Sequence, residues 1–179
     1  MIRSLHADAA RQVTRAAPEI LPLAARFLFA AVLLLFFWNS ARTKLGEGLM
    51  GLFRPSDGAY IQIFPRVVEQ AGYNFGQLGA YHWFVVTAGM WAEFLLPALV
   101  VLGLLTRLAA LGMIGFVVVM SVTDILGHGV GGADLGAWFD GAPGALILDQ
   151  RALWVLLLLV PVLLGPGRLS ADRALGLER

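Results

Sequence analysis

The sequence predicts an all-α integral membrane protein, a bundle of four transmembrane helices. Of its 179 residues, 59% are hydrophobic and only 14% are charged, and the mean hydropathy is +0.77. This composition is far more apolar than that of a soluble domain of similar length. The chain also contains four apolar runs long enough for a bilayer core of about 30 Å, which needs roughly 20 helical residues.

The predicted spans divide the chain into three parts. Residues 1–19 form a first segment, residues 20–165 the four-helix domain and residues 166–179 a tail. The first segment lacks the apolar stretch of a signal peptide, so we expect the first span to remain in the mature protein. The fourth apolar run is short and is expected to take extra length from the preceding "ALILDQR". The spans cover about 20–38, 83–105, 108–125 and 150–164.

The arginines predict the orientation of the bundle. With four spans, both terminal segments and the tight hairpin at residues 106–107 share one side, which carries Arg3, Arg11, Arg15, Arg107, Arg168, Arg173 and Arg179. The first connection on the other side has four basic residues, and the third connection has acidic residues and no basic one. By the positive-inside rule, both termini are expected to be cytoplasmic.

The two long connections are therefore expected on the extracytoplasmic side. The first contains "FPRVVEQAG", which we interpret as a short amphipathic helix that lies on the membrane surface or caps the bundle. The third connection, "GHGVGGADLGAWFDGAPGA", lacks GxGxxG spacing and follows no strand, so a turn or a mobile lid is expected and not a nucleotide site. In the amphipathic helix, Phe64, Val67, Val68 and Ala71 share one face, and Arg66, Glu69 and Gln70 the other.

One carboxylate, Glu93, lies near the middle of the second span, where ionisable groups are costly and commonly functional. At 3.6 residues per turn it shares a stripe with His82, Val86, Met90 and Pro97, which we expect to face the bundle interior. Pro97 removes the hydrogen bond that the Glu93 carbonyl would otherwise accept. This favours a kink and a polar pocket beside the carboxylate.

Arg26, inside the first span, is the predicted partner of Glu93. It lies nearer the cytoplasmic side, so the two groups meet only if Arg26 reaches toward the midplane. Two readings stay open. On the first, the role of Glu93 is structural: it forms a buried pair with Arg26 that fixes the helix register, or it is protonated and bonds to a backbone carbonyl. On the second, Glu93 takes part in chemistry. Buried ion pairs are by themselves weak evidence of function.

A second polar group is predicted near the extracytoplasmic ends of the spans. Ser121, Asp124 and His128 share one face, and the last two have the i, i+4 spacing of a metal-binding or proton-relay pair. The simpler interpretation is that the histidines lie at the hydrated membrane–water interface. A metal site or a haem between His82 and His128 is a less favoured alternative, and we expect no metal. His82, Asp149 and Arg151 are expected at the same level, completing a ring of proton donors and acceptors.

Cysteine is absent from the sequence. The chain therefore forms no disulfide, ligates no cluster through thiolates and carries out no thiol exchange. A redox role requires a bound cofactor, a quinone or a partner subunit.

Three stretches resemble the DoxX family of small four-helix bacterial membrane proteins. "WAEFLLPALVVLGLLTRLAALG" is similar to the hairpin of its second and third helices. "ARFLFAAVLLLFFWNSARTKL" is similar to its first helix, with Arg26 and Lys44 at matching places. "LLLLVPVLLGPGRLSADRAL" is similar to its last helix and tail, represented here by Gly165, Pro166, Gly167, Ser170 and Asp172. The resemblance covers residues 23–174, although the first and third connections look longer than in the shortest members.

The resemblance implies a fold more than an activity, because one fold hosts several functions. Members include membrane subunits of thiosulfate:quinone oxidoreductase and partners of oxidative-stress enzymes. We therefore expect a membrane subunit of a quinone-linked oxidoreductase or a redox-defence complex. The alternative is a non-catalytic scaffold, assembly factor or anchor. In either case the expected partners are the lipid bilayer and another protein subunit or a second copy, and not nucleic acid.

On the redox hypothesis, each polar candidate has an expected role. Proton exchange with a quinone needs acid–base groups beside an apolar slot, and an anionic substrate needs cations at the extracytoplasmic face. The predicted catalytic residues are Glu93, Asp124 and His128, the predicted cofactor-binding residues are Arg26, His82 and Met90, and the predicted substrate-binding residues are Arg42 and Lys44.

Overall fold

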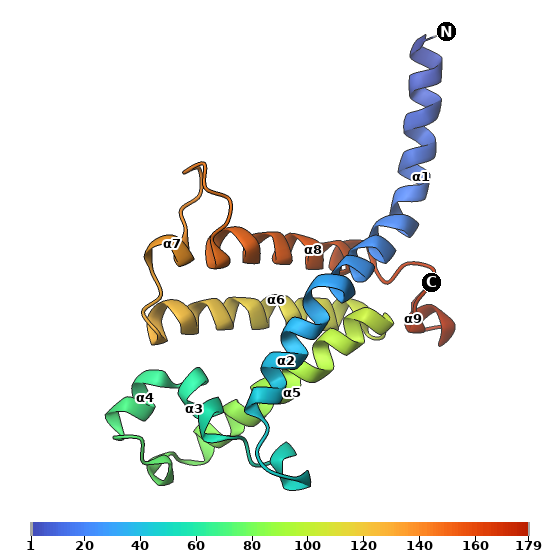
Figure 1. Ribbon diagram of the computed structural model, residues 1–179. Coiled ribbons are helices and arrows are strands. Elements are labelled where there is room, and N and C mark those ends of the chain that lie inside the picture. The colour runs from blue at the N-terminus through green and yellow to red at the C-terminus, as the bar shows by residue number, and fades with distance from the viewer. Residues whose placement is uncertain (1, 179) are drawn as a thin grey trace.

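The computed structural model describes residues 2–178, with side chains from His6 onward, and its regular elements in this range are all helical. Four helices are long and apolar enough to cross a membrane, which confirms the predicted all-α membrane bundle (Figure 1). The first is α1 (Ile2–Phe29), which continues through a π-helical turn (Ala30–Leu34) into α2 (Leu35–Lys44). The others are α5 (Ala80–Leu102), α6 (Thr106–Val122) and α8 (Arg151–Leu164).

The spans form a closed ring of neighbours. α6 packs against α8, α8 against α1, α2 against α5, and α5 against α6. In Figure 1, α6 and α8 run side by side, and the continuous α1–α2 helix crosses them together with α5. Aromatic rings fill the centre: Phe37 stacks on Phe29 and meets Phe116 and Trp154 edge to face. The outer surface is apolar as well, so the spans contact the lipid bilayer.

We call the end where α5 turns into α6 the hairpin end. Gly103 ends α5 with φ +68°, and Leu105 follows with φ +48°. The left-handed conformation costs glycine little, so the helix ends there although the apolar run continues. For this reason the helix ends at Leu102, whereas the sequence pattern extended it to residue 105.

The tail after α8 closes the hairpin end. The carboxylate of Asp172, in α9 (Ala171–Ala174), accepts hydrogen bonds from the backbone N–H of Leu105 (2.7 Å), and from the N–H (2.9 Å) and hydroxyl (2.6 Å) of Thr106. These groups begin α6 and would otherwise lack partners. Burial raises the pKa of Asp172, but these bonds and the nearby charge of Arg26 outweigh it, so the pKa lies below its ordinary value.

We call the opposite end, which carries the long connections, the loop end. The first connection contains 3₁₀ turns (Leu49–Leu52 and Phe75–Gln77) and the helices α3 (Asp57–Ile63) and α4 (Pro65–Gln70). α4 is the predicted amphipathic helix: Val68 is buried, whereas Arg66, Glu69 and Gln70 are exposed. α3 was not predicted, and it packs against α2 and α5, so this connection caps the bundle.

Both α6 and α8 have a π-helical turn at the loop end. Thr123–Gly127 continues α6, and Leu146–Gln150 precedes α8. The second turn confirms that "ALILDQR" lengthens the fourth span, which runs from Leu146 to Leu164. The third connection between the two turns contains a single short helix, α7 (Gly132–Leu135).

Candidate functional site

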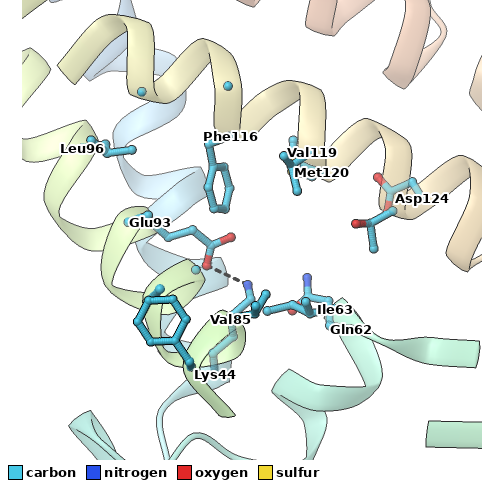
Figure 2. A pocket seen from close by; sticks show the side chains of 17 residues that line it. Lys44, Gln62, Ile63, Val85, Glu93, Leu96, Phe116, Val119, Met120 and Asp124 are labelled. Atoms are coloured by element: carbon cyan, nitrogen blue, oxygen red, sulfur yellow. Dashed lines mark hydrogen bonds and ion pairs between the residues drawn. The ribbon is translucent and has the colours of Figure 1, made fainter. Parts of the chain in front are cut away.

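A cavity of about 390 Å³ lies between α2, α3, α5 and α6 toward the loop end (Figure 2). Its volume falls within the range of about 300–1,000 Å³ that is typical of small-molecule sites. Small residues on two facing helices make the space: Ala88, Gly89 and Ala92 on α5, and Gly112 and Gly115 on α6. A Cβ atom on Gly115 would meet no other atom within 4 Å, so this glycine borders open space.

A buried ion pair forms part of the cavity wall. Lys44 Nζ donates to Glu93 Oε2 at 2.7 Å and to Ser40 Oγ at 2.9 Å. The Ser40 hydroxyl in turn donates to Glu93 Oε1 at 3.1 Å. Only 3% of each charged side chain is exposed. Figure 2 shows Glu93 reaching from α5 to Lys44, with Phe116 of α6 above the carboxylate.

Local sequence explains how this triad is assembled. Lys44 is the last residue of α2, where a cation interacts favourably with the helix dipole, and Ser40 precedes it by one turn. Glu93 lies one turn before Pro97 on the buried stripe of α5. Burial of either charge alone would cost several kcal/mol, roughly, so each ion requires the other. Glu93 and Lys44 both line the cavity.

The prediction that Arg26 pairs with Glu93 was wrong. Arg26 donates to the carbonyls of Val100 (3.0 Å) and Val101 (2.8 Å) on α5, and to those of Pro166 (2.8 Å) and Leu169 (2.7 Å) in the tail. At 1.5 Å per residue, Arg26 lies about 27 Å along the helix from Lys44, at the hairpin end. Carbonyls at the end of a helix lack intrahelical partners, and here they accept from Arg26.

A second ion pair lies at the loop end of the cavity. Asp124, which lines the cavity, pairs with Arg151 at 2.5 Å. Arg151 is 5% exposed and also donates to Ser121 Oγ at 3.0 Å. The structure therefore brings three members of the predicted polar ring together. Asp124 lies within one π-helical turn and Arg151 directly follows another, and such turns often occur at functional sites.

His128 does not pair with Asp124 as the i, i+4 spacing predicted. Its Nε2 donates to the carbonyl oxygen of Gln62 in α3, at 2.9 Å. Asp124 is engaged by Arg151 instead, and His128 directly follows the π-helical turn over residues 123–127. His128 therefore connects α6 to the cap over the cavity.

The other two members of the predicted ring face elsewhere. The His82 ring packs edge to face on Phe64, with centroids 5.0 Å apart. Asp149 accepts a hydrogen bond from the backbone N–H of Ala145 at 2.9 Å. Among residues 2–178, no group of three histidine or carboxylate side chains could hold a metal ion.

The predicted binding residues also differ in their positions. Arg26, His82 and Met90 do not belong to the cavity wall, and Met90 is fully buried. Arg42 is exposed on α2. Lys44, expected at the extracytoplasmic surface, is buried and neutralised by Glu93.

Sequence reasoning missed Ser40 and the glycines of the cavity. Ser40 precedes Lys44 by four residues, and Gly112 and Gly115 follow each other at i, i+3. Both spacings place the members of each set on one helical face. Small residues on one face of a span usually indicate close helix packing, so the pattern alone does not reveal a cavity.

Part of the cavity lining between α5 and α6 is exposed, and we call this exposed part the mouth. Phe84 on α5 and Val119 on α6 line it, and each is 64% exposed. Ala88 and Gly115 beside them are exposed too. All four residues belong to membrane spans, so the mouth opens sideways onto lipid.

Comparison with known proteins identifies one family. The family model of DoxX matches residues 21–128, more than half of the chain. The matched residues include Ser40, Lys44, Glu93 and Asp124, whereas the last helix and the tail lie outside them. No curated protein and no solved structure matches the chain. The chain belongs to the DoxX family.

Proposed function

We propose that this protein is the quinone-binding membrane subunit of an oxidoreductase, in a bacterial inner membrane with both termini in the cytoplasm. The observation that carries the proposal is the buried Lys44–Glu93 pair on the wall of a cavity that opens onto lipid. A ligand that reaches this pair from the bilayer needs an apolar body and a polar head. The resemblance to quinone-linked members of the family supports the same class of ligand.

The residues present fit a quinone ring. Phe116 and Met120 of α6 line the cavity, and aromatic and thioether groups pack favourably against flat rings. The longest bond of Lys44 Nζ, at 3.4 Å to the Ser40 carbonyl, is the one that a ligand carbonyl would replace at least cost. The isoprenoid tail of such a ligand would leave through the mouth between Phe84 and Val119.

A bound quinone supplies a two-electron, two-proton couple. On this proposal, Glu93 holds and releases a proton at its carboxylate, and its hydrogen bonds with Lys44 and Ser40 fix the orientation of that carboxylate. On the same proposal, Asp124, which is 27% exposed at the loop end of the cavity, exchanges protons with the surface. Because the sequence has no cysteine, we assign the electron donor to a partner subunit.

A second candidate function is that of a scaffold or anchor. The observation that favours it is that Lys44, Ser40 and Glu93 satisfy one another, as a pair that only fixes helix register would. On this proposal, changes in the cap over the loop end would release the partner, and changes in the cavity would not.

Ligand retention in matched variants tests the proposal. The full chain is purified gently as wild type, Glu93→Gln and Glu69→Gln, the last altering an exposed carboxylate of α4, and bound lipids are identified by mass spectrometry. We expect quinone with the wild type and the Glu69 variant, and at least a tenfold loss with Glu93→Gln. An empty wild-type bundle would reject the quinone site and favour the scaffold.

A further variant separates binding from folding. Gly115→Leu places a side chain in open space beside the mouth and leaves the ion pair intact. We expect it to lose quinone with an unchanged melting temperature. Quinone that persists in this variant would place the ligand elsewhere on the bundle.

A further inference from the structure

The first helix is about twice as long as the bilayer requires. It is continuous from His6 to Lys44, 39 residues, or about 58 Å at 1.5 Å per residue, whereas the hydrocarbon core is about 30 Å thick. The apolar run begins only at Ile20. Residues 6–19, which we call the N-terminal extension, therefore lie outside the hydrocarbon core. Figure 1 shows this part of α1 projecting beyond the other spans.

The N-terminal extension is amphipathic. At 100° per residue, Ala9, Val13 and Ala16 fall on one side of the helix, and Arg11 and Arg15 on the other. The apolar side is uncovered, because Val13 is 69% exposed. Exposure of this apolar face to water is unfavourable, so we expect it to contact lipid or protein.

The apolar side continues into the lipid-facing surface of the span. Val13, Ile20 and Phe27 follow at intervals of seven residues, about two turns, and are 69%, 61% and 72% exposed. Pro18 and Pro22 lie between them inside α1. Each proline removes a backbone hydrogen bond and lets the helix bend at this point.

The charges suit an anionic surface. Arg11 pairs with Asp8 on the same helix, and Arg15 is exposed one turn further. The carboxylate of Glu19, the other acid of this segment, is contacted by Arg168 (3.4 Å) and Arg173 (3.3 Å) of the tail. Basic groups thus dominate where the extension meets the bundle.

We propose that the N-terminal extension lies on the membrane surface as an interfacial helix, bent at Pro18 and Pro22. Its apolar side enters the headgroup region, and Arg11 and Arg15 bind anionic phospholipid headgroups. Because most of its apolar side chains are alanines, hydrophobic insertion is weak and attachment depends on the anionic lipid. This proposal is independent of the quinone site.

Because the sequence contains no cysteine, a single introduced cysteine can be labelled specifically. Single-cysteine forms of the full chain, Val13→Cys and Thr14→Cys, are labelled with an environment-sensitive fluorophore and reconstituted below one protein per vesicle. Vesicles are phosphatidylcholine alone, or phosphatidylcholine with about a third phosphatidylglycerol. Doxyl-labelled lipids serve as quenchers.

The two positions lie on different sides of one helical turn and act as matched controls. In anionic vesicles, we expect the emission of the probe at residue 13 to shift to the blue and to be quenched by doxyl lipid. The probe at residue 14 should remain exposed to water. Replacing Arg11 and Arg15 by alanine, or adding salt, should reduce the quenching to its level in neutral vesicles. Water around both probes in anionic vesicles would overturn the proposal, and so would shielding that is insensitive to lipid charge.

Discussion

The buried pair of Lys44 and Glu93 makes a quantitative prediction about stability. The two groups are 2.7 Å apart and 3% exposed, so removing one of them leaves the other charged group without its partner. Breaking a buried ion pair in this way costs about 3–5 kcal/mol. We expect Lys44→Met to lower the free energy of unfolding by this amount, measured by reversible unfolding in mixed micelles.

Double substitution separates the ion pair from packing. Lys44→Met combined with Glu93→Leu removes both charges, and apolar replacement of a buried pair is often close to neutral. The double variant should therefore be more stable than Lys44→Met alone, with a coupling energy of about 2 kcal/mol or more. The exposed pair of Asp8 and Arg11 is the control, and Asp8→Asn should change stability by less than about 0.5 kcal/mol. Additive costs for the two buried substitutions would refute this reasoning.

Three further predictions concern the cavity and the hairpin end. Gly115→Ala should retain ligand and Gly115→Leu should lose it in the lipid extract, while Val118→Leu on the lipid-facing side of α6 should match the wild type. Gly103→Ala should lower the free energy of unfolding by more than about 1 kcal/mol, because the φ of +68° is strained for alanine and its Cβ would lie 2.6 Å from the Arg26 guanidinium. Asp172 has a lowered pKa when folded, so its stabilising contribution is complete above its unfolded pKa of about 3.9 and is lost as the pH falls through the folded value. The melting temperature of the wild type should therefore fall more steeply below about pH 4 than that of Asp172→Asn, and parallel curves would contradict this assignment.

The apolar pattern predicted the fold because the bilayer dictates it. Backbone groups in lipid must be satisfied within a segment, so runs of about 20 apolar residues have few choices other than a helix. The amphipathic pattern of residues 64–71 likewise predicted α4, whose polar side chains are exposed. Helix ends were less predictable. The end of α5 depends on the backbone at Gly103, and the helical structure before Ile20 has no long apolar run to indicate it.

The site was only partly predictable, because partner choice is a property of tertiary structure. The sequence indicated that Glu93 needs a cation, and Arg26 was the predicted partner, whereas Lys44 was assigned to substrate binding at the extracytoplasmic face. Glu93 pairs with Lys44 because α5 packs along α2 at the level of Lys44, and Arg26 donates to free carbonyls at the hairpin end instead. In the same way, Asp124 pairs with Arg151 of α8 and His128 bonds to Gln62 of α3, rather than the two with each other.

Two features that each reduce stability coincide at the cavity. A buried ion pair seldom stabilises more than apolar side chains of similar volume, and glycine within a helix costs about 1 kcal/mol relative to alanine. The glycine could be removed by a single substitution, since the space beside Gly115 admits a side chain, and the ion pair by replacing both of its residues together. A bundle that served only as a scaffold would gain from filling this space. Because the open space and the ion pair occupy one site with a mouth onto lipid, their coincidence favours a ligand that enters from the bilayer.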